Sequence, residues 1–235
     1  MKIAILDLTR HPQPLLAGLQ RASDQILDWL SPALSDADFT IYDIAEAVDP
    51  MPLPDAFDGL ILSGSELGVY DDAPWIPSLR QLLIATKQAR KPIFGICFGH
   101  QIMADTFGGK AEKAKGGNVI GVRDFTDDQG HRFPAYVWHQ DQVTELPPEA
   151  SVIATASYCP MAVLRYDFPA LSVQYHPEFS ADFLMGLLKC GRNHFVDAVV
   201  ADAAWGEISN KPVDGHLNCH QVAAFFRDDQ GKQSQ

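Results

Sequence analysis

Apolar and polar positions in the first half of the chain follow two periods, one typical of short buried strands and one typical of amphipathic helices. Apolar runs with the length of buried strands occur at residues 2–6, 39–44, 59–62 and 92–96. Segments with the spacing of helices occur at residues 15–30, 79–90 and 99–107. This alternation predicts an α/β fold, doubly wound, with a mostly parallel central sheet and helices on both faces.

The pattern changes near residue 117, where strand-like segments follow one another without helices between them. These segments lie at residues 118–125, 135–138, 152–155, 161–166 and 170–176. They predict an antiparallel extension of the sheet, followed by a return to its centre. Residues after Ser180 are expected to be helical, with a frayed end from Asp228 to Gln235. No repeat or linker divides the chain, so residues 1–235 are expected to form a single domain with a helical extension from about residue 181.

The charge balance argues against nucleic acid as a partner. The chain has 18 Lys and Arg against 30 Asp and Glu, a net charge of −12, and an acidic surface repels phosphate backbones. The densest basic stretch, from Lys110 to Lys115, is interrupted by Glu112 and is expected to be a solvated loop or an edge strand. No apolar run approaches the length of a membrane span, so no membrane partner is expected. The start does not read as a signal peptide and the four cysteines show no CxxC pair, which favours a cytoplasmic location.

The strongest candidate for chemistry is Cys97, at the junction between a predicted strand and a predicted helix. This is the context of a nucleophile elbow, whose sharp turn requires small neighbours, and Gly95 and Gly99 supply them. A helix N-terminus favours the thiolate, because free N–H groups and the helix dipole stabilise negative charge. The backbone N–H of Phe98 is the expected donor to an oxyanion.

A thiolate nucleophile needs a group that moves protons, and the candidate is His176. A short apolar strand leads to His176, and Glu178 follows two residues later, where it can hold the second imidazole nitrogen. Cysteine, histidine and carboxylate together predict a catalytic triad. Glycine-rich nucleotide loops and the metal motif HExxH are missing from the sequence, so we expect neither a cofactor nor a metal ion.

The segments GICFGHQ (residues 95–101) and QYHPEF (residues 174–179) resemble the class I, triad-type glutamine amidotransferases. The resemblance extends over roughly residues 2–183. Within the family, the chain resembles the amidotransferase part of GMP synthase, but without a fused synthetase domain. It implies hydrolysis of the glutamine side-chain amide through a γ-glutamyl thioester, with release of ammonia. Cys97 would be the nucleophile, His176 the general base and then acid, and Glu178 its orienting partner.

The resemblance also implies a substrate site. The loop after the third strand would place Gly64 at the substrate and the backbone N–H of Ser65 in the oxyanion hole, although Ser65 and Glu66 replace the usual Gly and Pro. Gln101 would meet the substrate, and Asp141 would face its ammonium group. The other expected lining residues are Trp138 and Gln140. His139 is not expected to be the base, and His176 is preferred because Glu178 is its neighbour and because it lies beside a strand end.

Three functions remain open at this point. The first is a glutaminase that passes ammonia to a separate synthetase subunit. The second is a hydrolase of γ-glutamyl peptides or γ-glutamyl amines, because the altered Ser65–Glu66 loop and Trp138 could admit a larger leaving group. The third is a regulatory binding protein without catalysis, which an intact Cys97, His176 and Glu178 argue against.

Overall fold

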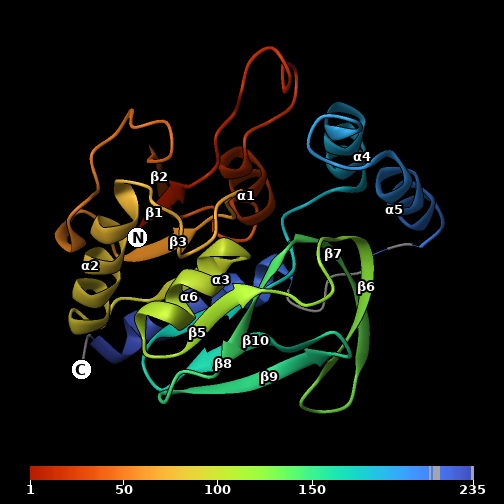
Figure 1. Ribbon diagram of the computed structural model, residues 1–235. Helices are drawn as coiled ribbons and strands as arrows, with labels where there is room; N and C mark the ends of the chain where they lie inside the picture. The colour runs from red at the N-terminus through yellow and green to blue at the C-terminus, as the bar shows by residue number, and fades with distance from the viewer. Residues whose placement is uncertain (212, 214–217, 234–235) are drawn as a thin grey trace.

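The computed structural model describes residues 1–211, 213 and 218–233. Its strands are β1 (Lys2–Asp7), β2 (Asp38–Asp43), β3 (Gly59–Leu62), β4 (Ile93–Ile96), β5 (Lys110–Lys113), β6 (Val119–Asp127), β7 (Arg132–His139), β8 (Asp141–Glu145), β9 (Ala150–Ala156), β10 (Cys159–Tyr166) and β11 (Ala170–Val173). Its helices are α1 (Ala22–Leu30), the short 3-10 helix η1 (Pro54–Ala56), α2 (Trp75–Gln88), α3 (Phe98–Thr106), α4 (Ala181–Gly191), α5 (Ala198–Asn210) and α6 (Cys219–Gln233). Figure 1 shows their arrangement.

The central sheet combines a parallel half with an antiparallel half. Within the described residues its strand order is β2-β1-β3-β4-β11-β10-β9-β6-β7. The strands from β2 to β11 in this order are parallel, and the remaining strands pair antiparallel. β5 and β8 form a separate two-stranded sheet. The predicted antiparallel extension and the return of the chain to the centre, as β11 beside β4, are therefore confirmed.

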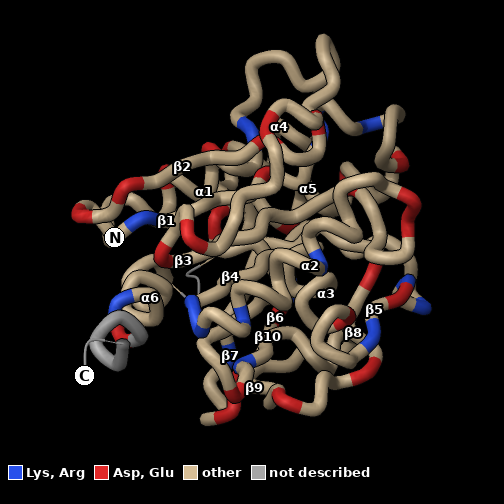
Figure 2. Tube along the Cα trace, turned by 90° about the vertical axis from the view of Figure 1, so that its left-hand side faces the viewer, with Lys and Arg blue, Asp and Glu red and all other residues tan. Residues whose placement is uncertain are grey.

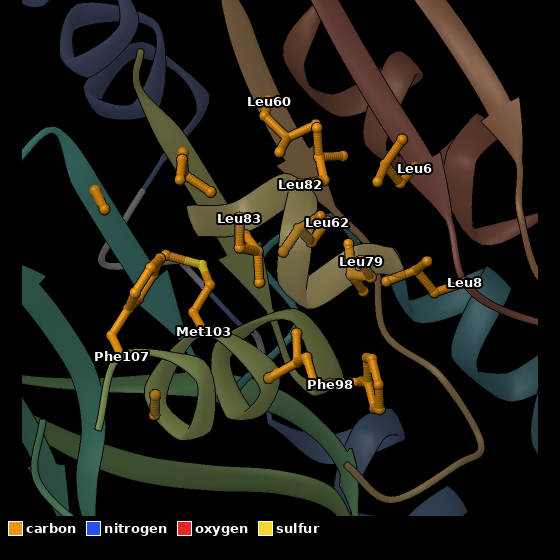
Figure 3. Packing of buried hydrophobic residues seen from close by; sticks show 14 of the residues in the cluster. Leu6, Leu8, Leu60, Leu62, Leu79, Leu82, Leu83, Phe98, Met103 and Phe107 are labelled. Carbon is orange, nitrogen blue, oxygen red and sulfur yellow. The ribbon is translucent and has the colours of Figure 1, made fainter. Parts of the chain in front are cut away.

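Helices cover both faces of the parallel half, as the doubly wound fold requires. Alternating side chains of each strand point to opposite faces, so Leu60 and Leu62 of β3 pack toward α2 and α3, whereas Ile61 packs toward α1 and α6. Figure 3 shows the first of these cores, in which strand leucines meet Leu79 and Leu82 of α2 and Phe98 of α3. The predicted fold class is confirmed.

The helical extension packs on the antiparallel end of the sheet. Ile120 and Val122 of β6 are buried against Leu184 and Leu188 of α4, and Ala204 of α5 joins the same cluster. The prediction of helices after Ser180 is confirmed by α4, α5 and α6, while residues 212 and 214–217 lie outside the described residues. This packing holds α4 against the antiparallel end of the sheet.

Several predicted elements have different bounds. The helix predicted at residues 15–30 is wrong in its first half, where turns replace it, because Gly18 has a left-handed φ of 84° that ends helical geometry. The strand predicted to end at His176 ends at Val173, because the N–H of His176 donates to the carbonyl of Tyr136 in β7 (2.9 Å) and leaves the sheet register. The sequence pattern missed β8, and it had given residues 110–115 only as a loop or an edge strand.

The C-terminal end also differs from the prediction. Helix α6 continues to Gln233 instead of fraying from Asp228, because Val222, Ala223 and Phe226 bury one face of the helix and anchor it. Residues 234 and 235, the last part of that prediction, lie outside the described residues.

Charged residues are dispersed over the surface. In Figure 2 the basic residues are separated from one another by acidic and neutral stretches, and acidic residues are more numerous. In the described part of the chain, no helix has both the length and the apolar character that crossing a membrane requires.

Candidate active site

Cys97 occupies a strained turn between β4 and α3. Its φ of 52° and ψ of −103° place a residue with a side chain in the left-handed half of the map, which costs about 1 to 3 kcal/mol. The surrounding backbone holds this turn: Cys97 N–H donates to the carbonyl of Val173 (2.8 Å), and Gly99 N–H donates to that of Ser63 (3.2 Å). A Cβ atom on Gly99 would lie 2.7 Å from Cβ of Leu62. The turn is therefore possible only with a very small residue at position 99.

His176 and Glu178 form a buried pair beside this turn. Nδ1 of His176 lies 2.7 Å from Oε1 of Glu178, and the two residues are 6% and 5% exposed. The ring of Phe179 stacks on the imidazole with 4.0 Å between centroids and 8° between planes. Burial alone would lower the pKa of His176, but the negative charge of Glu178 and the Cys97 sulfur outweigh it and raise that pKa above its ordinary value of 6.5. The pair therefore favours an imidazolium.

Gly64, from the loop after β3, closes the space between the nucleophile and the base. A Cβ atom on Gly64 would lie 3.2 Å from Cε1 of His176 and 3.6 Å from Cβ of Cys97. Three segments far apart in the sequence thus meet at one point, at the carboxyl ends of parallel strands, where ligands bind in open α/β sheets. A thiol, an imidazole and a carboxylate in this order can generate a thiolate and move its proton.

A cleft of about 580 Å³ opens over this point. All the residues that the sequence predicted for catalysis line it, together with the predicted substrate residues Gly64, Ser65, Gln101, Trp138, Gln140 and Asp141. Phe98 does not line the cleft, because its ring is buried against Trp75 in the core (5.6 Å between centroids). Only its backbone N–H, at the first position of α3, can take part, and such an N–H has no partner within its own helix.

The Cys97 sulfur contacts two groups besides the histidine. Its S–H donates to the carbonyl of Trp138 (3.6 Å), and the amide Nε2 of Gln174 donates to Sγ (3.7 Å). Gln101 supports this arrangement from α3, because its Nε2 donates to the carbonyl of Asp141 (2.8 Å) and to Oε1 of Gln174 (3.2 Å). The side chain of Gln101 is thus engaged within the protein. Sequence reasoning missed Gln174, although its place in the QYHPEF segment, two residues before His176, was a usable signal.

Asp141 is a buried residue in the lining of the same cleft. Its Oδ1 accepts a hydrogen bond from the hydroxyl of Tyr70 (3.2 Å), a residue that sequence reasoning did not select. Burial raises the pKa of Asp141, which the Tyr70 hydrogen bond partly offsets. Burial also raises the pKa of Tyr70 to about 12, with a further contribution from Asp141. This carboxylate is held in place by a neutral donor and has no cation paired with it among the described residues.

His139 does not act with Cys97 in this arrangement. Its Nδ1 lies 3.0 Å from the carbonyl of Asp141, and its Nε2 lies 3.4 Å from the hydroxyl of Tyr158. Burial lowers the pKa of His139 to about 4, so the ring is neutral near neutral pH. Both nitrogens already have partners, which agrees with the choice of His176 as the candidate base.

A group of apolar residues in the cleft lining was not predicted. The group comes from the segment before α1, from α4 and from the loop after α4, and it includes Leu16, Leu19, Phe183, Leu187 and Phe195. No sequence signal connected these residues, because the first two lie far from the other three along the chain. Over the described ranges, no cluster of three or more His, Cys, Asp or Glu side chains is placed to hold a metal ion.

Comparison with known proteins shows the family of this chain. The family model described as glutamine amidotransferase class-I matches residues 28–183. Gamma-glutamyl peptidase 3 of Arabidopsis thaliana is 32% identical over 148 residues, which is 57% of this chain and 59% of that protein. A glutamine-hydrolyzing GMP synthase subunit from Methanothrix thermoacetophila is 45% identical over 95 residues, which is 37% of this chain and 52% of that protein. The matches thus span less than two thirds of these relatives.

Solved structures show the same fold. A glutamine amidotransferase from Methylobacillus flagellatus superposes with a TM-score of 0.76 at 18% identity, covering 97% of this chain and 94% of that chain. A glutamine amidotransferase from Thermotoga maritima superposes with a TM-score of 0.71 at 17% identity, covering 97% of each chain. At these identities the likeness concerns the fold alone. With the family model matching most of the chain, including the Cys97 turn and the His176–Glu178 pair, this protein belongs to the class-I glutamine amidotransferase family.

Proposed function

We propose that this protein hydrolyses the side-chain amide of glutamine through a γ-glutamyl thioester on Cys97. The observation that carries the proposal is the convergence of three groups: Cys97 in its strained turn, His176 next to it, and Glu178 at 2.7 Å from the far nitrogen of that histidine. Each group supplies one requirement of nucleophilic catalysis, namely the nucleophile, the proton carrier and the group that orients the carrier.

The reaction then has two halves. The Cys97 thiolate adds to the γ-carbonyl carbon, and the backbone N–H groups of Phe98 and Ser65 stabilise the oxyanion. The C–N bond breaks, His176 gives its proton to the nitrogen, and ammonia leaves. Water then loses a proton to His176 and adds to the thioester, the C–S bond breaks, and glutamate is released.

The buried Asp141 supports the choice of a γ-glutamyl group. A carboxylate whose pKa is already raised by burial gains from a positive partner, and the α-amino group of a γ-glutamyl compound supplies one. Gln140 and Trp138 line the cleft next to Asp141 and are the proposed contacts for the rest of the glutamyl group. Gly64 leaves room for the γ-carbonyl between Cys97 and His176.

A second candidate is hydrolysis of γ-glutamyl peptides or amines by the same residues. The cleft continues well beyond Cys97 into an apolar region, for which glutamine itself has no use. The relatives named gamma-glutamyl peptidase favour this candidate, whereas the GMP synthase relative favours a separate synthetase as partner. Both candidates share the thioester chemistry.

The test is release of glutamate and amine from purified protein, with glutamine and a γ-glutamyl dipeptide in parallel. We expect turnover of at least one substrate, and its loss in Cys97→Ser. Cys190→Ser, a change of the same kind at a half-buried thiol outside the cleft, serves as the matched control and should retain activity. If Cys97→Ser turned over substrate as fast as the control, the thioester mechanism would be wrong. If wild type were inactive and unlabelled by an electrophilic glutamine analogue, a non-catalytic binding role would replace it.

A further inference from the structure

We propose that the apolar part of the cleft binds the leaving group of the substrate, and that this leaving group is an uncharged amine with an aromatic or branched aliphatic substituent. The inference rests on the proposed γ-glutamyl hydrolysis. It adds a second recognition site beside the one for the glutamyl group. We call this region the amine pocket, defined by Leu16, Leu19, Phe183, Leu187 and Phe195 together with Ile120, and Trp138 lies at its border with the site for the glutamyl group.

The amine pocket is continuous with the reacting atoms. Cys97, His176 and the residues that define the pocket line the same cleft. Aromatic rings lead from the base into it: Phe179 stacks on His176 at 4.0 Å, and Phe183 lies 4.8 Å from Phe179. On the other side, Trp138 lies 6.2 Å from Phe195. A group attached to the departing nitrogen, next to His176, therefore enters a surface of aromatic and aliphatic side chains.

The segment between β1 and α1 and helix α4, which form two walls of the amine pocket, contact each other. In Figure 1 the red segment between β1 and α1 rises at the top of the molecule beside α4. A Cβ atom on Gly186 of α4 would lie 2.7 Å from Cδ2 of Leu19, so the two segments are in direct contact. This contact turns a surface depression into a space with walls on two sides, as a site for a small organic group requires.

The fixed charges at this end of the cleft cancel. Nε of Arg10 pairs with Oε1 of Glu66 at 3.2 Å, and Glu178 is already bound to His176. Asp141 faces the glutamyl end. Because Arg10 and Glu66 neutralise each other, a charged substituent would lose hydration without gaining a net charge of opposite sign. An uncharged apolar substituent avoids this cost and gains from leaving water.

The residues of the amine pocket also have a distinct position in the sequence. The family model matches residues 28–183, which contain the nucleophile, the base and the glutamyl residues. Leu16, Leu19, Leu187 and Phe195 all lie outside that range. The chemistry thus comes from the shared part of the family, whereas most of the walls around the leaving group come from segments outside the family match.

The experiment compares three amides of glutamate that differ only in the leaving amine. The probes are γ-glutamyl methylamide, γ-glutamyl phenethylamide and γ-glutamyl phenylalanine, which adds a carboxylate to the phenethyl group. We expect kcat/KM to be about tenfold or more higher for the phenethylamide than for the methylamide, since burying a phenyl group is worth more than about 1.4 kcal/mol. The phenylalanine compound should fall below the phenethylamide.

Variants locate the effect. Leu187→Ser and Phe195→Ser should reduce the ratio of phenethylamide to methylamide hydrolysis several-fold toward one. Val199→Ser, at a 77% exposed position of α5 outside the cleft, is the matched control and should keep the wild-type ratio. Circular dichroism confirms that each variant is folded.

The outcomes separate the two proposals. Hydrolysis of all three amides with a ratio near one, or a ratio that both pocket variants leave unchanged, would overturn the amine pocket while the proposed function stands. Faster hydrolysis of the phenylalanine compound than of the phenethylamide would overturn the preference for an uncharged amine. No hydrolysis of any amide or of glutamine would overturn the proposed function itself, and with it the inference that depends on it.

Discussion

At the scale of single residues, the reactivity proposed for Cys97 depends on groups that are buried beside it. The imidazole of His176 is enclosed by Glu178 on one side and by the ring of Phe179 on the other. Burial disfavours a charged imidazole, and Glu178 together with the Cys97 sulfur more than compensates for it, so these two neighbours set the protonation state of His176. The second oxygen of Glu178, Oε2, has no hydrogen-bond partner among the described residues, so this carboxylate serves the histidine alone.

The first prediction concerns Glu178→Gln. Glu178 raises the pKa of His176, so the variant should lower it, and the imidazolium should persist only to a lower pH. The alkaline limb of kcat/KM should therefore move to lower pH, and activity near neutral pH should fall by about 10²-fold or more. The check is the pH profile of glutamine hydrolysis for wild type, for Glu178→Gln and for Glu149→Gln at a surface site.

The same pair affects stability with a defined sign. The folded-state pKa of His176 is raised, so its contribution is fully present below about pH 6.5, the pKa of an unfolded histidine, and is lost as pH rises through the raised value. Denaturant unfolding at several pH values measures this directly. An alkaline limb that stayed in place in Glu178→Gln would show that His176 does not owe its charge to Glu178.

At the scale of elements, the site is made by the way α3 packs against the ends of β3 and β4. A Cβ atom on Gly95 would lie 2.7 Å from the backbone of Gly99, and one on Gly99 would lie 2.7 Å from the carbonyl of Leu62. The helix can start directly at the nucleophile only because both positions lack side chains. Buried side chains of α3 such as Ile102 and Met103 then fix the helix on the sheet.

The second prediction compares two glycine substitutions in helices. Gly99→Ala forces a methyl group against β3 and should lower the free energy of unfolding by about 1 to 3 kcal/mol, with loss of activity. Gly206→Ala in α5 has open space at its Cβ position and should raise the free energy of unfolding by about 0.5 to 1 kcal/mol. Urea unfolding of both variants is the measurement. Equal effects of the two changes would show that the close approach at Gly99 is not restrictive.

Local sequence was sufficient for the parts of the site that lie within a few residues of one another. The Cys97 turn with its two glycines and the His176–Glu178 pair are readable because each is contained in a short segment. The contact of Tyr70 with Asp141 joins residues 71 positions apart, and that of Leu19 with Gly186 depends on where α4 packs. Such contacts follow from tertiary packing, which hydrophobic periodicity does not encode. The same limit explains the helix predicted from residue 15, where a left-handed Gly18 overrides the apolar spacing.

At the scale of the whole molecule, the last helix returns to the first strands. Phe226 of α6 is fully buried, and a Cβ atom on Gly59 of β3 would lie 2.8 Å from its ring and 2.8 Å from Ile3 of β1. The side of the sheet that faces away from α2 and α3 is thus closed by residues from both ends of the chain. This packing supports our proposal that residues 1–235 form a single domain.

The third prediction follows from that closure. Phe226→Ala should lower the free energy of unfolding by about 3 to 5 kcal/mol, because it leaves a cavity between α6 and the sheet. Unfolding should remain a single transition, with fluorescence and circular dichroism changing together. Phe195→Ala, at a 47% exposed phenylalanine, is the matched control and should cost much less. Two separate transitions in wild type would contradict a single cooperative domain.

The central claim is that Cys97 forms a covalent γ-glutamyl intermediate, and rapid-quench mass spectrometry tests it most directly. Wild-type protein mixed with glutamine or γ-glutamyl phenethylamide and quenched in acid should carry one added γ-glutamyl group, located on the peptide that contains Cys97. The adduct should be lost in Cys97→Ser and should accumulate when water attack is slowed. Substrate turnover with no adduct on Cys97, or an adduct on another residue, would contradict the account.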